Sequence, residues 1–350
     1  MQKIKSSARN YGRCIGILFF SIIFLILGVC FSTLVSDKNE SLITAHADAC
    51  PYHTTPLTAG GTLNSGTYYL TGDLTLTSPI TVNGTVNICL NGYVLNCSDS
   101  GKQSITINSG RTLNLYDCGN DDNHKHYYTK NSNHIYVLGS GTDYITGGVI
   151  SGKTTASSCV IDNSGTFNMY GGNIAGNHNA IWNYNTFNMY DGKICGNAGA
   201  NSPGVYTANR TYFNMYGGEI SDNCCSESVN CAGGIYCFGN VTVSGDAKIF
   251  DNTRSNGVTV SNVYTRTKLT IGSEGLKDGA YIGISVAVGQ NFNAGTFIVA
   301  NNSSQATSDL LNNYFFNDAN AHIHNYGALV PRQEAADCSH TGLEAHYQCS

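Results

Sequence analysis

The sequence predicts an all-β protein whose main domain is a right-handed parallel β-helix, a solenoid with three short strands in each coil. Three observations predict this fold class. A kernel of alternating apolar and polar residues recurs along the chain. Gly, Asn, Ser and Thr, with regularly placed Ile, Val, Leu, Phe and Tyr, dominate the composition and favour strands and turns. No segment between the kernels has the 3.6-residue periodicity of a helix.

The repeated kernel is the strongest signal. It is clearest in four segments: Thr166–Asn177, Thr186–Asn197, Tyr212–Asn223 and Val241–Asn252. The steps from Phe167 to Phe187, Phe213, Val241 and Leu269 are 20, 26, 28 and 28 residues. A constant kernel with variable steps indicates repeats that differ in loop length.

Each repeat is expected to contain three strands. Within the kernel, Phe167 and Met169 share one face, while Asn168 and Tyr170 share the other. A short strand precedes the kernel, and another begins at Ile174 after a Gly-Gly turn. Stacked repeats then bury a continuous apolar column. One corner carries a recurring asparagine, whose amides are placed to bond from coil to coil: Asn177, Asn197, Asn223 and Asn252.

The first residues have the layout of a secretory leader. Lys3 and Arg13 belong to a positive start, the run Ile15–Val35 is apolar, and Ala45–Ala47 offers small residues to a signal peptidase. We expect residues 1–47 to be a signal peptide, or a signal anchor that forms a hydrophobic helix. Membrane contact is expected only through residues 15–35. The remainder is predicted to be exported, to an extracellular or cell-surface location.

Cysteine usage agrees with export. Of the 14 cysteines, Cys14 and Cys30 lie in the leader, which leaves twelve in an oxidising environment where disulfides form. The candidates for a disulfide-stapled loop cluster after one kernel: Cys224, Cys225, Cys231 and Cys237. The alternative of a zinc site is less favoured, and the pairing does not follow from the sequence.

Two parts of the predicted solenoid resemble a known family. Gly233–Ile235 followed by Ile249–Asn252, and the opening Leu63–Asp73 through Asn91–Leu95, are similar to repeats of bacterial cell-surface adhesin-like proteins with pectin-lyase-like β-helices. The resemblance implies a β-helix over residues 48–318, in a fold family that contains adhesins, lyases and hydrolases.

The tail has a different pattern. Residues 319–350 resemble the start of a small Cys/His repeat found in tails of bacterial surface proteins, and we expect this copy to be truncated. Its candidate zinc ligands in a complete repeat would be Cys338, His340, His346 and Cys349.

The sequence predicts no catalytic residue, no cofactor and no metal site. The net charge of -5 without a basic stripe argues against nucleic acid as a partner. An insertion around Asn120–Asn133 carries Asp121, Asp122, His124 and His126, with His134 nearby. We interpret it as a solvated loop; a metal site and a diverged catalytic site near Asp121, Asp122 and His124 are the alternatives.

The outward face of the kernels is the candidate ligand-binding surface. Its predicted residues are Tyr116, Tyr170, Tyr190, Tyr216, Asn168, Asn188 and Asn214, with Asn114 in the same register. Such a face would bind a sugar polymer or a protein, or the tyrosines would only stabilise neighbouring strands. Trp182 and His178 are expected beside it.

The leading hypothesis is therefore an exported, surface-displayed, non-catalytic β-helix, an adhesin or scaffold for polysaccharide or a host surface protein. The alternatives are a polysaccharide lyase or glycoside hydrolase with a diverged site, and a structural stalk for a missing C-terminal domain.

Overall fold

The computed structural model describes ten stretches of the chain: residues 51–98, 103–154, 158–200, 202–228, 231–265, 267–284, 298–299, 314–317, 321–323 and 329–331. The chain divides into two units, Met1–Pro51 and Tyr52–Ser350, and the described strands belong to the second. The leader, including residues 15–35, and the tail residues Cys338 to Cys349 lie outside the described residues. In these stretches, no helix is long and apolar enough to cross a membrane.

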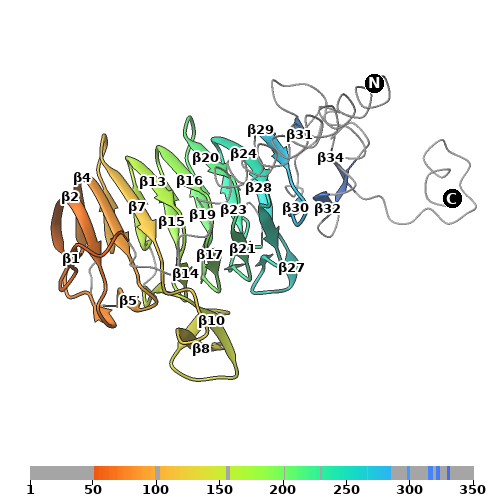
Figure 1. Ribbon diagram of the computed structural model, residues 1–350. Coiled ribbons are helices and arrows are strands. Elements are labelled where there is room, and N and C mark those ends of the chain that lie inside the picture. Colours follow the sequence, from red (N-terminus) through yellow and green to blue (C-terminus); the bar gives the residue numbers. More distant parts are fainter. Residues whose placement is uncertain are drawn as a thin grey trace, which may run out of the picture. The chain divides into compact units, whose positions relative to one another are not determined.

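The described elements are β-strands, and the largest sheet they form contains 16 of them (Figure 1). Its pairings between kernels are parallel. The strands are β1 (Thr55–Pro56), β2 (Gly61–Tyr69), β4 (Ile80–Cys89), β6 (Ile105–Ile107), β7 (Thr112–Tyr116), β12 (Ile161–Asn163), β13 (Thr166–Met169), β15 (Ile181–Asn183), β16 (Thr186–Met189), β19 (Val205–Thr207), β20 (Tyr212–Met215), β23 (Ile235–Cys237), β24 (Asn240–Gly245), β28 (Val263–Thr265), β29 (Leu269–Leu276) and β31 (Ile298–Val299).

A second parallel sheet takes one strand from each repeat. Along the chain, β12 and β13 of the first sheet are followed by β14 of the second, and the order recurs with β15, β16 and β17. The second sheet contains β3 (Leu74–Thr75), β5 (Val94–Asn96), β11 (Val149–Ser151), β14 (Asn173–Ala175), β17 (Lys193–Cys195), β21 (Glu219–Ser221), β25 (Lys248–Phe250), β30 (Tyr281–Ile284) and β32 (Phe315–Asn317).

Three smaller sheets complete the described strands. One continues the repeats beyond the second sheet through β18 (Ala198–Gly199), β22 (Cys224–Cys225), β26 (Thr253–Arg254) and β27 (Thr259–Val260). Another contains β33 (Ala321–Ile323) and β34 (Leu329–Pro331). The third is an insertion with β8 (Lys125–Lys130), β9 (Tyr136–Leu138) and β10 (Asp143–Thr146).

The kernels pair residue for residue. Phe167 lies opposite Phe187, and Phe187 lies opposite Phe213, so each ring stacks on its copy in the next repeat, with centroids 4.9 and 4.7 Å apart. All three rings are fully buried, together with the methionine two residues later in each kernel. Burying one such side chain contributes about 1.5–3 kcal/mol. The predicted apolar column is confirmed, and the stacked parallel strands are consistent with a β-helix or solenoid.

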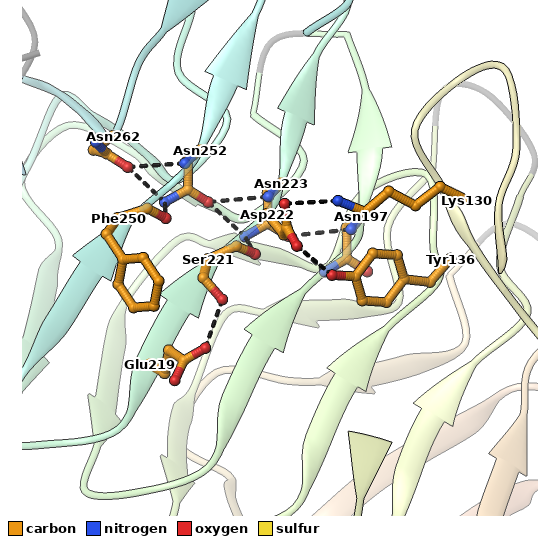
Figure 2. Close-up of polar contacts among 10 residues, drawn as sticks. All are labelled: Lys130, Tyr136, Asn197, Glu219, Ser221, Asp222, Asn223, Phe250, Asn252 and Asn262. Atoms are coloured by element: carbon orange, nitrogen blue, oxygen red, sulfur yellow. Dashed lines mark hydrogen bonds and ion pairs between the residues drawn. The ribbon is translucent and has the colours of Figure 1, made fainter. Parts of the chain in front are cut away.

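The buried corner asparagines form the predicted amide ladder, and Figure 2 shows its part from Asn197 to Asn262. The side-chain amide of Asn177 donates to Asn197 at 3.0 Å, Asn197 donates to Asn223 at 2.9 Å, and Asn223 donates to Asn252 at 2.9 Å. The ladder extends to Asn262, which accepts from Asn252 at 2.9 Å. Each Oδ1 also accepts a backbone N–H, as between Asn197 and Asn223 at 3.2 Å. A buried amide would otherwise cost several kcal/mol, so the ladder fixes the register of successive repeats.

The insertion differs from the solvated loop expected from its sequence. Its strands form an antiparallel sheet, in which β8 pairs with both β9 and β10. Tyr128 and Tyr136 stack within it at 3.7 Å. The backbone N–H of Tyr136 donates to the carbonyl of Gly196 at 2.9 Å, which fastens the insertion to the second sheet. Tyr136 and Ile145 are buried in a small apolar cluster with residues of the second sheet, and Tyr128 packs against that cluster, which explains why this polar segment folds.

The amide ladder should carry much of the stability of the repeats. Asn223→Ala removes the acceptor of the Asn197 amide and the donor to two buried carbonyls, those of Ile194 and Ser221. We expect a loss of about 3 kcal/mol in the free energy of unfolding, measured by chemical denaturation. Asn214→Ala, in the half-buried outer row of the same repeat, is the control, with an expected loss below about 1 kcal/mol because water replaces the amide. Equal losses would contradict the role given to the buried ladder.

Candidate ligand-binding groove

The predicted outer tyrosines form one continuous stack. The rings of Tyr116 and Tyr170 are 4.9 Å apart, those of Tyr170 and Tyr190 are 4.7 Å apart, and those of Tyr190 and Tyr216 are 4.9 Å apart. Tyr52 stacks on the free side of Tyr116 at 3.8 Å. The interplanar angles between successive rings are 13° or less. The register expected from the kernels is therefore confirmed.

The outer asparagines run beside this stack as a second ladder. The amide of Asn214 donates to Asn188 at 2.9 Å, Asn188 donates to Asn168 at 2.8 Å, and Asn168 donates to Asn114 at 2.7 Å. The ladder continues from Asn114 to Asn87 at 2.7 Å. These amides are half-buried and bonded to one another, so much of their hydrogen-bonding capacity is used within the protein.

The tyrosine stack is a poor platform for a sugar. A sugar ring packs on the face of an aromatic ring, and each internal ring of this stack has both faces covered by its neighbours. Tyr170 and Tyr190 are 39% and 41% exposed, and the exposed part of each ring is therefore its edge and hydroxyl. Burial raises the pKa of Tyr190, with Tyr170 and Tyr216 adding to the shift, so its hydroxyl stays neutral. This geometry favours the structural interpretation of the ladder.

A groove lies where the insertion meets the second sheet. Its volume is about 560 Å³. The insertion contributes Tyr128, Tyr136 and Tyr144 to the wall, and the ends of β17, β21 and β25 form the floor. The floor side chains include Lys193, Glu219, Ser221, Asp222, Phe250 and Asp251. Aromatic groups and hydrogen-bonding groups therefore converge on one concave surface, as in ligand sites generally.

Asp222 is the centre of the polar contacts in the groove (Figure 2). Its carboxylate accepts a hydrogen bond from the Tyr136 hydroxyl at 2.5 Å and pairs with the Lys130 ammonium at 2.9 Å. Nearby, the Ser221 hydroxyl donates to Glu219 at 2.7 Å, and Glu219 pairs with Lys193 at 3.4 Å. Burial raises the pKa of Tyr136 above its ordinary range, and Cys195 and the Asp222 carboxylate add to the shift.

The corner before each ladder asparagine explains where the groove opens. This position is occupied in successive repeats by Gly176, Gly196, Asp222 and Asp251, all with positive φ, between 53° and 71°. At Gly196 a Cβ would lie 2.1 Å from the Tyr136 ring, so only glycine accommodates the insertion there. In the next two repeats, the same corner position carries an aspartate instead of a glycine, first Asp222 and then Asp251. The change from Gly-Asn to Asp-Asn is a signal of this site that the sequence does contain.

The acids singled out in the sequence lie elsewhere. Asp121 accepts from His124 at 2.9 Å, and Asp122 pairs with Lys125 at 2.9 Å, both on an exposed turn. Neither acid lines the groove, although Asn120 does. His126 bonds to the carbonyl of Gly92 at 2.8 Å. The groove instead brings Glu219 and Asp222 of one repeat together with Asp251 of the next, an arrangement that the sequence does not predict.

Trp182 and His178 are separate from the tyrosine stack. Trp182 lies in register with Tyr206, and Tyr206 with Tyr236, in a row along the first strand of each repeat. The ring of Tyr206 contacts that of Tyr236 at a centroid distance of 6.2 Å. His178 shares a hydrogen bond with Asn179 at 2.9 Å, and burial lowers its pKa. This second aromatic row was not expected from the kernels.

The four clustered cysteines separate into different environments. Cys225 and Cys231 are joined as a disulfide, with their Cα atoms 6.5 Å apart, which staples the loop between them. Cys224 packs with Ile135 and Ala198, and Cys237 belongs to the central apolar core. A stapled loop is therefore confirmed for one pair.

Comparisons with family models, with curated proteins and with solved structures gave no match to this chain.

The stacked tyrosines should stabilise the protein. Tyr190→Ala removes a ring that contacts Tyr170 and Tyr216 on its two faces, so we expect a loss of about 1–2 kcal/mol in the free energy of unfolding. Tyr212→Ala is the control in the neighbouring repeat, because that ring is 52% exposed. Its expected change is within about 0.5 kcal/mol. Chemical denaturation measures both, and an unaffected Tyr190→Ala protein would contradict the structural role.

The Tyr136 hydroxyl should make stability sensitive to alkaline pH. Its folded-state pKa is raised, so its contribution is complete below the ordinary tyrosine pKa of about 10 and is lost as pH rises above that value. We expect Tyr136→Phe to be less stable than the wild type at pH 7 and to lose less stability between about pH 9 and 11. Chemical denaturation at about pH 7, 9 and 11 measures the free energy of unfolding of each protein, with Tyr127→Phe as the control. Parallel curves for wild type and Tyr136→Phe would refute it.

Proposed function

We propose that the chain is an exported, surface-displayed parallel β-helix that binds an extended polysaccharide in the groove beneath the insertion, without catalysing a reaction. The observation that carries the proposal is the groove itself, an open cavity of about 560 Å³ with aromatic walls and a polar floor. It lies along the ends of strands from successive repeats, so neighbouring sugar units of one chain would contact neighbouring repeats.

The aromatic walls support a sugar ligand. Tyr144 is 48% exposed, and its ring meets that of Tyr127 edge to face rather than face to face. Lys125 lies 4.7 Å from the centroid of the Tyr144 ring. A ring held in place at one side and open at another is suited to pack on the apolar face of a pyranose. This contrasts with the closed stack of Tyr170, Tyr190 and Tyr216.

The charges of the floor support a neutral polymer. Glu219, Asp222 and Asp251 line the groove against Lys193, and Lys130 partly neutralises Asp222. An excess of carboxylates repels a polyuronate or a sulfated glycan at close range. The same carboxylates accept hydrogen bonds from sugar hydroxyls, and such bonds to charged acceptors are stronger than neutral ones.

The finer architecture is part of the same proposal. We infer that β12, β13 and β14 make one coil of three strands, because the next three strands repeat their order and pair with them in register. Right-handed winding is supported by the general preference of parallel crossover connections. Residues 1–47 would export the chain, and residues 15–35 would anchor it if the leader is retained.

One observation favours a second candidate, cleavage of the bound polymer. The Tyr136 hydroxyl and the Lys130 ammonium both donate hydrogen bonds to the Asp222 carboxylate, which is the kind of arrangement that moves protons. Binding alone is preferred because Asp222 is already engaged by two partners. The two candidates differ in whether new chain ends appear.

Binding is tested with the full chain and a panel of neutral, acidic and amino polysaccharides in affinity electrophoresis or titration calorimetry. We expect retention by a neutral polymer and an affinity about tenfold lower for Tyr144→Ala, a difference of about 1.4 kcal/mol. Tyr212→Ala, an exposed tyrosine outside the groove, should bind like the wild type. Equal weakening by both substitutions, or binding of acidic polymers only, would refute the groove as the site.

Catalysis is tested in the same samples by release of reducing or unsaturated ends. We expect none. Product that disappears in Asp222→Asn, and persists when Asp121 and Asp122 are changed to Asn, would replace the binding function by the enzymatic one.

A further inference from the structure

Three potential metal ligands converge at the N-terminal end of the described strands. The Cys118 Sγ atom lies 3.2 Å from the Cys89 Sγ and 3.0 Å from the His53 Nε2. All three ligand atoms lie within 4.8 Å of one another, and among the described residues no other set of three or more His, Cys, Asp or Glu ligands is brought together in this way. The sequence does not predict this cluster, whose members are 29 and 65 residues apart along the chain.

Each ligand comes from a separate element. Cys89 is the last residue of β4, Cys118 follows β7, and His53 precedes β1. The His53 ring is held by stacking on Tyr69 at 4.5 Å, and the neighbouring Tyr52 stacks on Tyr116 at 3.8 Å. The cluster therefore rests on ordered parts of the first repeats, with its histidine already oriented toward the sulfur atoms.

We propose that His53, Cys89 and Cys118 bind one zinc ion, which fastens the segment before β1 to the first repeats. Two thiolates and one imidazole are ligands that Zn²⁺ prefers, with a fourth position left for water or an oxygen donor. Asn91 supplies such an oxygen beside the cluster, since its Oδ1 lies 3.5 Å from the Cys118 Sγ.

The geometry requires only a small movement for zinc. With Zn–S bonds of about 2.3 Å and a tetrahedral angle, two sulfur ligands are about 3.8 Å apart, against 3.2 Å here. A metal is therefore accepted with shifts of a few tenths of an ångström at each ligand.

The competing chemistry is a disulfide between Cys89 and Cys118, which the exported environment would favour. It would form by loss of two hydrogen atoms from the two thiols to an external thiol oxidant, and it would leave His53 without a role. The imidazole nitrogen at 3.0 Å from Cys118 is the observation that favours metal over disulfide.

The test counts zinc in the full chain, purified without added reductant, by elemental mass spectrometry. We expect the wild type to hold one equivalent more than His53→Phe or Cys118→Ser. His53→Phe preserves an aromatic ring against Tyr69 while removing the ligand nitrogen. The matched controls are His124→Ala and Cys195→Ser, neither of which touches the cluster, and both should hold as much zinc as the wild type.

Replacement of zinc by Co²⁺ gives a second readout, because cobalt–thiolate bonds absorb in the near ultraviolet. This band should be weaker in Cys118→Ser and unchanged in Cys195→Ser. Circular dichroism confirms that the variants fold, and if Cys118→Ser does not, His53→Phe decides the question. Equal zinc in wild type and His53→Phe would overturn the proposal, as would a Cys89–Cys118 crosslink in peptides of the unreduced, alkylated protein.

Discussion

The register between successive repeats is the constraint on which the rest of this structure depends. Asn197 and Asn223 are fully buried, and the side-chain amide of each donates to the asparagine of the next repeat. A slip of one residue would break these bonds and turn Phe187 and Met189 from the core to the surface. The kernels are therefore constant, while the loops between them are free to vary in length.

Because the kernels are constant, the features that could form a binding site come from the loops, which differ between repeats. The largest insertion among the described residues forms its own sheet and packs on the second sheet where Gly176 and Gly196 leave room. In the two repeats that follow, the same corner carries Asp222 and Asp251. The insertion and these two carboxylates therefore line the same groove. The left-handed backbone of that corner is required by the fold in each repeat, and only the side chain has changed.

The sequence predicts what repeats and misses what does not. Kernel register, the phenylalanine column and both amide ladders follow from the spacing of identical residues. The groove does not, because Lys130 and Tyr136 reach Asp222 across 92 and 86 residues without any repeated pattern. His53 and Cys118 are likewise 65 residues apart. The position of the tyrosine stack was predicted, with ligand binding and strand stabilisation both left open, and the covered ring faces favour stabilisation.

The first repeat differs from the internal ones because its outer strand has a neighbour on one side only. An internal strand has a partner on each side, whereas a terminal strand leaves a row of backbone groups that can pair with another chain. Here β1 pairs with β2, Tyr52 covers the end of the tyrosine stack, and His53 reaches the two thiols. β1 itself is only two residues long, and both are exposed. Such a short strand holds little energy of its own, so the contacts of Tyr52 and His53 are what keep the segment in place. A bond from His53 through a metal would secure this segment to the first repeats.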